Sequence, residues 1–247
     1  MSQELSRQEL AEIAGHLMAA KLFSLASCVM LFYDVFLTFG EEVERIWKRK
    51  FAPMTVLWFL NRYLSPLGYI VIIVSFHQPW SKEVCNRYVL YPEALKIVTS
   101  LTIGIIFNLR LYAIYSRSMI IAIMGSLLLA VELGVKIWAF TDGTSLDLPE
   151  GIVGCILVGK SHARFVFTWI AELAFDSIMF FATLYRVIVH NRLRHGNTMN
   201  LVDLILRDGV IYFGIIFVAN LVTVLMFLLA PPDIKAMNAS FSTLYVI

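Results

Sequence analysis

The stretch MIIAIMGSLLLAVELGVKIWAF, residues 119–140, decides the class of this fold. Apart from Glu132 and Lys136, it carries no charged side chain. A helix that crosses a bilayer needs about 20 mostly apolar residues. The stretch has that length, and it lacks the alternation of apolar and polar residues that marks a transmembrane β-strand. It therefore predicts a membrane-spanning α-helix.

Further apolar stretches on both sides of this one predict an all-α fold, a polytopic transmembrane helix bundle in a receptor-like seven-helix layout. The expected spans are residues 17–39, 53–76, 94–115, 119–140, 164–189, 204–229 and a partial 237–247. The loops between them are too short for another domain, so residues 1–247 are predicted to form a single transmembrane domain. The last stretch is shorter than the roughly 20 residues that a span needs, which predicts a truncated seventh helix.

The composition supports a membrane protein and excludes a nucleic-acid-binding one. Hydrophobic residues make up 59% of the chain and charged residues 15%, whereas about a quarter of the residues of a soluble domain are charged. The net charge of +2 includes no basic domain that could hold nucleic acid. Glu4, Glu9 and Glu12 occupy the place where a cleavable signal peptide carries positive charge, so we expect the N-terminus to stay attached. The expected partner is the lipid bilayer.

The basic residues predict the orientation of the chain. Ten of them cluster on the side where the positive-inside rule places the cytoplasm: Arg45, Lys48, Arg49, Lys50, Arg110, Arg117, Arg186, Arg192, Arg194 and Arg207. Eight, including Lys96 near the start of the third span, are assigned to the opposite side. Because ten against eight is a small difference, the prediction rests on the clustering. We expect the N-terminus outside, in the plasma membrane or a membrane of the secretory pathway.

Two of the three cysteines are candidates for a disulfide. Cys28 lies within the first span, whereas Cys85 and Cys155 fall in two loops on the predicted outer side. Outer loops face an oxidising compartment, where disulfides form and persist. The alternative is two free thiols, because Cys155 lies in the apolar run of residues 151–158.

Charged side chains within the spans are the main candidates for function. Each costs about 2.5 to 3.5 kcal/mol to insert at mid-membrane, so such residues mark functional sites by default. The charged candidates are Asp34 in the first span, Arg62 in the second, Glu132 and Lys136 in the fourth, and Glu172 and Asp176 in the fifth; the polar Asn61 beside Arg62 joins them.

The spacing of four within the last two pairs places both members of each pair on one helix face. Glu132 and Lys136 can neutralise each other within their own helix. Glu172 and Asp176 repel each other, so either a cation lies near them or one of them holds a proton. Arg62 and Lys136 are the candidate cations within the chain. A ligand amine, a metal ion or a transported proton is the alternative.

No catalytic, metal or cofactor site is predicted. His16, His77 and His162 all fall near the predicted outer face, but no two of these three have a zinc-ligand spacing such as H-x-x-x-H. The chain has no G-x-S-x-G nucleophile elbow and no glycine-rich phosphate loop. We therefore expect no cofactor and no enzymatic activity.

One N-terminal segment carries a recognisable signature. Tyr33-Asp34, Leu37-Thr38, Glu41-Glu42, Ile46-Trp47 and Leu60-Asn61-Arg62-Tyr63 form the pattern YD-x-x-LT, an acidic turn, IW and then LNRY. This pattern resembles the signature of an uncharacterised family of fungal, mainly basidiomycete, multipass membrane proteins, a domain of unknown function. The resemblance implies a seven-helix layout. Proteins of the family usually continue beyond the seventh span into an Arg-containing cytoplasmic tail, which this chain lacks.

The signature also suggests a structural contact. Asp34 lies about one turn inside the membrane, and Arg62 enters from the same side on the next span. We expect a buried pair between Asp34 and Arg62. Loss of one partner of such a pair typically costs about 3 to 5 kcal/mol, so an architectural role is favoured over a functional one.

Three functions remain as hypotheses. The leading one is a receptor-like or sensory protein with an unknown small ligand at its outer face and an unknown cytoplasmic partner. Asn108-Leu109-Arg110 differs from the acidic-Arg-Tyr motif of G-protein-coupled receptors, so coupling to a G protein is not implied. The second hypothesis is a small proton- or ion-coupled transporter or channel, based on the mid-membrane charges. The third is an intramembrane lipid enzyme.

Overall fold

The computed structural model describes residues 7–48, 50–88, 90–141, 143–145, 154–155, 157–159, 162–193 and 201–229. In chain order, its elements are α1 (Arg7–Glu42), the π-helix η1 (Val43–Trp47), α2 (Pro53–His77), α3 (Lys82–Tyr88), α4 (Leu90–Ile114), α5 (Met119–Phe140), β1 (Gly143–Ser145), β2 (Leu157–Gly159), α6 (His162–Leu193) and α7 (Leu201–Leu229). The expected all-α, polytopic bundle is confirmed. The short helix α3 and the β1–β2 pair are additions that the sequence did not predict.

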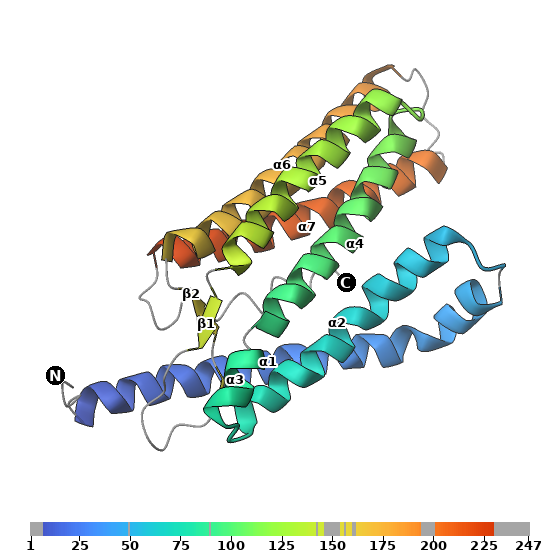
Figure 1. Ribbon diagram of the computed structural model, residues 1–247. Coiled ribbons are helices and arrows are strands. Elements are labelled where there is room, and N and C mark those ends of the chain that lie inside the picture. Colours follow the sequence, from blue (N-terminus) through green and yellow to red (C-terminus); the bar gives the residue numbers. More distant parts are fainter. Residues whose placement is uncertain are drawn as a thin grey trace.

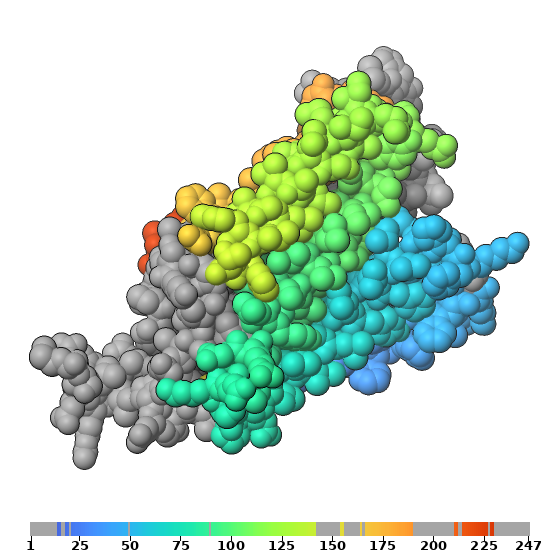
Figure 2. All heavy atoms as spheres, viewed as in Figure 1, coloured from blue at the N-terminus to red at the C-terminus, as the bar shows by residue number. Residues whose placement is uncertain are grey.

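The long helices alternate in direction along the chain (Figure 1). α1 and α2 form one antiparallel pair, and α4 packs against α2 on one side and against α5 and α6 on the other. α7 packs against α6. Figure 2 shows that side chains of α2, α4 and α5 join into one continuous surface on the viewed face. α4 is therefore the helix that connects the α1–α2 pair with the α5–α7 group.

Five helical segments in the described part of the chain are long and apolar enough to cross a membrane. They are Lys21–Trp47, Pro53–His77, Lys82–Ile114, Met119–Phe140 and Val166–Val189, and α7 adds the shorter apolar segment Gly214–Met226. The predicted spans at 17–39, 53–76, 94–115, 119–140, 164–189 and 204–229 correspond to α1, α2, α4, α5, α6 and α7. The predicted partial span 237–247 lies outside the described residues.

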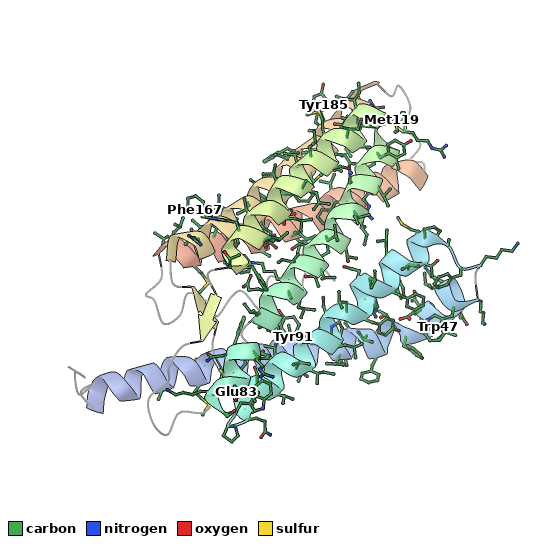
Figure 3. The ribbon with its side chains drawn as sticks, in the orientation of Figure 1. Trp47, Glu83, Tyr91, Met119, Phe167 and Tyr185 are labelled. Carbon is green, nitrogen blue, oxygen red and sulfur yellow. A yellow bond between two sulfur atoms is a disulfide. The ribbon has the colours of Figure 1, made fainter. Side chains whose placement is uncertain are left out.

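The outer faces of the helices are apolar, as a bilayer requires. Figure 3 shows Met119, Phe167 and Tyr185 on the periphery of the bundle, and all three side chains are exposed. In a soluble protein such extensive exposed apolar surface would mark an interaction site. Here the surface suits contact with lipid acyl chains, which confirms an integral membrane protein.

Local sequence accounts for several helix boundaries. Pro53 occupies the first turn of α2, where its missing N–H has no intrahelical partner to lose. Between α4 and α5 the chain reverses in a tight turn in which Ser116 and Arg117 adopt left-handed backbone angles, with φ of 56° and 62°. A bond from the Arg117 N–H to the Tyr112 carbonyl, 2.9 Å, closes this turn. The turn places α4 and α5 side by side.

The bundle core lies where α4, α5, α6 and α7 meet. Its buried side chains are Phe107, Leu111, Leu129, Phe175, Met179 and Ile216. A Cβ atom added at Gly104 would lie 2.3 Å from Leu129 Cδ1, so the absent side chain lets α4 and α5 approach closely. Small residues serve this purpose in membrane bundles, where packing rather than the hydrophobic effect drives helix association.

A disulfide and a small β ladder connect the loops at one end of the bundle. Cys85 of α3 is bonded to Cys155, with their Cα atoms 5.6 Å apart. The Cys155 N–H donates to the carbonyl of Ser75 at the end of α2, 3.2 Å away. β1 and β2 pair antiparallel, with Thr144 opposite Val158. We call this end of the bundle the disulfide cap; it fastens the α5–α6 loop to α2 and α3.

Replacing both bonded cysteines, as Cys85→Ala/Cys155→Ala, should lower the free energy of unfolding by about 2 to 4 kcal/mol. The disulfide joins residues 70 positions apart, so its loss frees a long loop in the unfolded chain. Thermal unfolding of the protein in detergent micelles measures the effect. Wild-type protein treated with a reducing agent should show a similar loss. A double variant as stable as the untreated wild type would contradict the prediction.

Candidate functional site

Arg62 of α2 lies at the centre of a first polar network, which binds α1 to α2. Its Nη1 donates to Asp34 Oδ2, 2.8 Å away, and its Nη2 donates to the Asp34 carbonyl at 3.3 Å. The same guanidinium donates to the hydroxyl of Thr38. Arg62 is buried, and its fork of N–H donors reaches both residues, which are one turn apart on α1.

Glu42, at the end of α1, collects the other contacts of this network. Its Oε1 accepts hydrogen bonds from Tyr63 Oη at 2.5 Å and from Trp47 Nε1 at 2.8 Å. Its Oε2 lies 3.8 Å from Arg62 Nε. Trp47 follows Glu42 by five residues, and the π-helix η1, with its i→i+5 repeat, brings the two side chains to the same face. We call Asp34, Thr38, Glu42, Trp47, Arg62 and Tyr63 the Arg62 network.

The expectation of a buried Asp34–Arg62 pair needs correction. The pair exists, but the Asp34 side chain is 61% exposed, whereas that of Glu42 is only 2% exposed. Glu42 is the buried acid because α1 extends to residue 42, beyond the predicted end of the span at residue 39, and Glu42 there packs against α2. The acidic turn Glu41-Glu42 was the signal in the sequence. Asn61 is half-buried and takes no part in the bonds of this network.

Lys136 of α5 lies at the centre of a second polar network, deep between α4, α5 and α6. Its Nζ lies 2.6 Å from Glu132 Oε1 and 3.2 Å from Glu172 Oε2, and it also donates to the hydroxyl of Ser100. Lys136 is completely buried. The i,i+4 spacing predicted its contact with Glu132. Of the two cations proposed for Glu172, the structure brings Lys136 to it and keeps Arg62 with Asp34.

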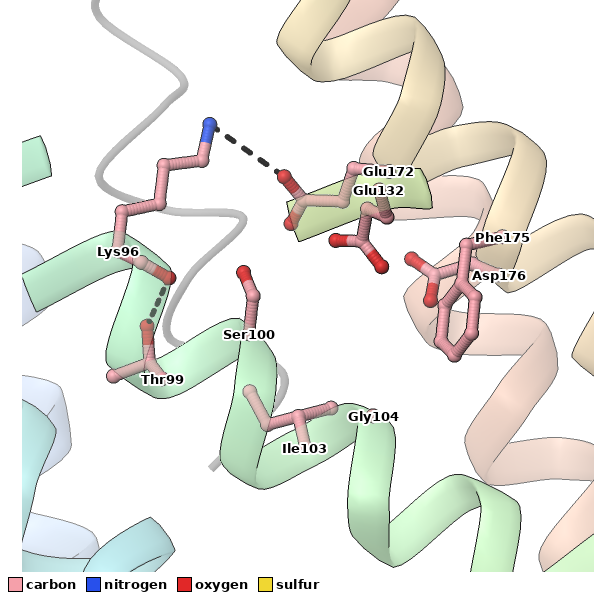
Figure 4. Close-up of a pocket in the computed structure, with 9 residues that line it drawn as sticks. All are labelled: Lys96, Thr99, Ser100, Ile103, Gly104, Glu132, Glu172, Phe175 and Asp176. Carbon is pink, nitrogen blue, oxygen red and sulfur yellow. Dashed lines mark hydrogen bonds and ion pairs between the residues drawn. The ribbon is translucent and has the colours of Figure 1, made fainter. Parts of the chain in front are cut away.

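Lys96 of α4 is a second cation for Glu172 that sequence reasoning missed. Its Nζ lies 3.5 Å from Glu172 Oε2 (Figure 4) and 3.2 Å from the centroid of the Trp169 ring, a cation–π contact. The positive-inside tally counted Lys96 as a charge of the outer side and did not consider that its side chain could point into the helix bundle. Lys96 and Ser100 are four residues apart, the same spacing that singled out the pairs on α5 and α6, so this signal was present in the sequence.

Asp176 lies one turn after Glu172 on α6 and contacts Asn220 of α7. Asn220 Nδ2 donates to Asp176 Oδ2 at 2.5 Å, and both residues are buried. The Asn220 amide oxygen has no hydrogen-bond partner within the described ranges. Sequence reasoning missed Asn220, although an amide inside an apolar span was a visible signal. We call Lys96, Ser100, Glu132, Lys136, Glu172, Asp176 and Asn220 the Lys136 cluster.

The Lys136 cluster carries an unbalanced formal charge. Two lysines face three carboxylates, which leaves one negative charge when all five groups are ionised.

A cavity of about 30 Å³ lies among Ser100, Glu132, Glu172 and Asp176 (Figure 4). A water molecule needs about 10 to 15 Å³ by the same measure, so the cavity has room for a water molecule or two, or for a small cation. An organic substrate does not fit in it.

His77, the histidine whose side chain is described, contributes to neither network. His77 is exposed at the end of α2, and the side chains of His16 and His162 lie outside the described part of the structure. No group of three His, Cys, Asp or Glu side chains among the described residues is placed to hold a metal ion.

The comparison with known families points to the Arg62 network. Residues 22–67 match the model of a family of unknown function, DUF6533. A search of curated proteins finds no match. All six residues of the Arg62 network fall within the DUF6533 match, whereas the whole Lys136 cluster lies outside it. The matched segment is therefore the one that folds α1 back on α2.

Proposed function

We propose that this protein is a receptor-like, sensory membrane protein with seven spans and its N-terminus outside, in the plasma membrane or a membrane of the secretory pathway. In this proposal the Lys136 cluster couples events at the disulfide cap to the arrangement of α4, α5 and α6. The observation that carries the proposal is the meeting of Lys96 and Lys136, from two helices, at the single carboxylate of Glu172 on a third.

Such a cluster suits a switch because its energy depends steeply on helix position. The cluster lies in a medium of low dielectric, where separating paired charges is expensive. A small displacement of α4 or α5 would break one ion pair of Glu172 and leave the other. Charged contacts between packed helices therefore favour discrete arrangements rather than continuous motion.

The position of the cluster supports its coupling to the cap. Lys96 follows the start of α4 by six residues, and Glu172 follows the start of α6 by ten. At about 1.5 Å per residue, these distances are about 9 and 15 Å along the helices. Both helices continue from the segments that the Cys85–Cys155 disulfide holds, so a ligand bound at the cap would displace them directly. An oxidising outer compartment also suits the disulfide, which supports the orientation.

Proton- or ion-coupled transport is the second candidate. The observation that favours it is the excess carboxylate of the cluster, because proton and ion relays in membranes use such groups. The cavity admits a proton or a small cation. In this case Asp176 and Glu172 would carry the ion.

Measurements of flux and of helix distance distinguish the two candidates. Proteoliposomes with wild-type protein and with Glu172→Gln/Asp176→Asn would be tested for proton and ion flux. Spin labels at Leu109 on α4 and Ile188 on α6, both exposed near the helix ends opposite the cap, would report the distance between these helices.

A sensory role predicts no flux in either protein and a changed distance distribution in the variant, which should remain folded by size-exclusion chromatography. Wild-type flux that the variant abolishes would establish transport instead. An unchanged distance distribution without flux would contradict a switch in the Lys136 cluster.

A further inference from the structure

We propose that the pocket between α1, η1 and α2 binds the headgroup of a phospholipid with a primary ammonium group, of the phosphatidylethanolamine type. The pocket has a volume of about 210 Å³ and is lined by Thr38, Glu41, Glu42, Arg45, Arg62 and Trp58. Pockets for drug-sized molecules measure about 300 to 1,000 Å³, so this one suits a headgroup. The proposal does not depend on the role of the Lys136 cluster.

The buried wall of the pocket holds a carboxylate oxygen that accepts no hydrogen bond. Glu42 Oε2 is buried and has no hydrogen-bond partner in the part of the chain that is described, and the same holds for Arg62 Nε, which lies 3.8 Å from it. A buried charged acceptor without a donor is unfavourable. An ammonium group has three N–H donors and a positive charge, and it would satisfy Glu42 Oε2. A choline group has no N–H donor and would not.

The rim of the pocket supplies the complementary charge for a phosphate. The Arg45 side chain is 74% exposed, and its ion pair with Glu41, one turn earlier, is 3.5 Å long. An exposed pair of this kind contributes little, so Arg45 is available to bind a phosphate with its planar guanidinium. Glu41 is then free to join Glu42 at the ammonium.

The charge of the lining favours a zwitterion over an anion. Glu41 and Glu42 balance Arg45 and Arg62, so the four charged lining residues sum to zero. A headgroup with only negative charge would meet two carboxylates. The alternation of acids and bases instead matches the ammonium and the phosphate of one headgroup.

The location of the pocket also fits a lipid. It lies where the first two spans meet, beside Trp47, which Figure 3 shows at the end of the α1–α2 pair. Tryptophan side chains are enriched at the level of the headgroups. Leu37 and Phe39 are exposed on α1 within two residues of the lining Thr38, and they offer an apolar surface to the acyl chains. The adjacent π-helix η1 is a type of irregularity that often marks a functional site.

Titration of the full chain in detergent micelles with short-chain lipids tests the proposal, with bound lipid counted by native mass spectrometry. Dioctanoyl phosphatidylethanolamine should bind at least about tenfold more tightly than dioctanoyl phosphatidylcholine, because one charged hydrogen bond is worth about that factor. Glu42→Gln should remove this preference. Inorganic phosphate at the same concentration should not displace the lipid.

Arg45→Gln provides a test that does not depend on the buried network, since it changes an exposed residue. It should weaken phosphatidylethanolamine binding about tenfold. Arg87→Gln is the matched control, because Arg87 is 82% exposed and forms the same kind of i,i+4 pair with Glu83 on α3. It should leave binding unchanged.

Three results would overturn the proposal: equal affinity for the two lipids, tighter binding of the anionic dioctanoyl phosphatidylglycerol, or Arg45→Gln and Arg87→Gln variants that bind alike. Failure to retain any lipid would be a fourth result against it.

Discussion

Lys136→Met should lower the free energy of unfolding by about 3 to 5 kcal/mol. The substitution keeps a long side chain in place but removes the ammonium group that lies 2.6 Å from Glu132 and 3.2 Å from Glu172. Glu132 is buried, so its carboxylate would remain in the bundle without its cation. Unfolding of the purified protein by SDS titration in mixed micelles measures the loss.

Two further variants separate the ion pair from general effects of the substitution. Arg87→Met removes an exposed cation from an i,i+4 pair, and it should cost no more than about 1 kcal/mol. Lys136→Met/Glu132→Met removes both partners and should recover part of the loss, because replacing a whole buried pair with apolar groups is much less harmful than breaking it. If Lys136→Met were as mild as Arg87→Met, the cluster would not be a desolvated ion network.

Arg62→Met should also destabilise the protein by about 3 to 5 kcal/mol, through loss of the contact between α1 and α2. It removes the guanidinium that bonds Asp34 and Thr38 and that lies beside the buried Glu42. Tyr63→Phe removes one hydrogen bond to Glu42, so its effect should be smaller, about 1.5 to 3 kcal/mol. The same SDS titration measures both variants.

Asp34→Asn identifies which acid matters most to Arg62. Because the Asp34 side chain is largely exposed and that of Glu42 is not, Asp34→Asn should cost clearly less than Arg62→Met. An equal loss in the two variants would show that Asp34, rather than Glu42, is the main partner.

The two polar networks serve different halves of the molecule. The Arg62 network binds α1 to α2 and lies within the segment that matches DUF6533. The Lys136 cluster binds α4 to α5 and α6, and Asn220 extends it to α7. The packing of α2 against α4 and the Cys85–Cys155 disulfide join the halves. A variant of one network should therefore leave the other intact.

The sequence alone determined the helical class, the order of the spans and the contacts within one helix. Long apolar stretches without alternation form helices in a bilayer, because a helix satisfies each backbone N–H and C=O within its own segment. The pairing of Glu132 with Lys136 was predictable because a spacing of four brings two side chains together on any helix.

Only the tertiary structure decided which helix faces meet. The sequence places Lys96 in the third span but leaves open whether its side chain faces lipid, the outer interface or Glu172. The rotation of α4 about its axis relative to α6 determines that it faces Glu172. The same holds for Asn220 and Asp176, which are 44 residues apart. Glu42 became the buried acid because α1 continues past the predicted end of the span and places Glu42 against α2. A spacing within one helix can mark such a residue as a candidate, but the packing of the whole bundle decides which partner it meets.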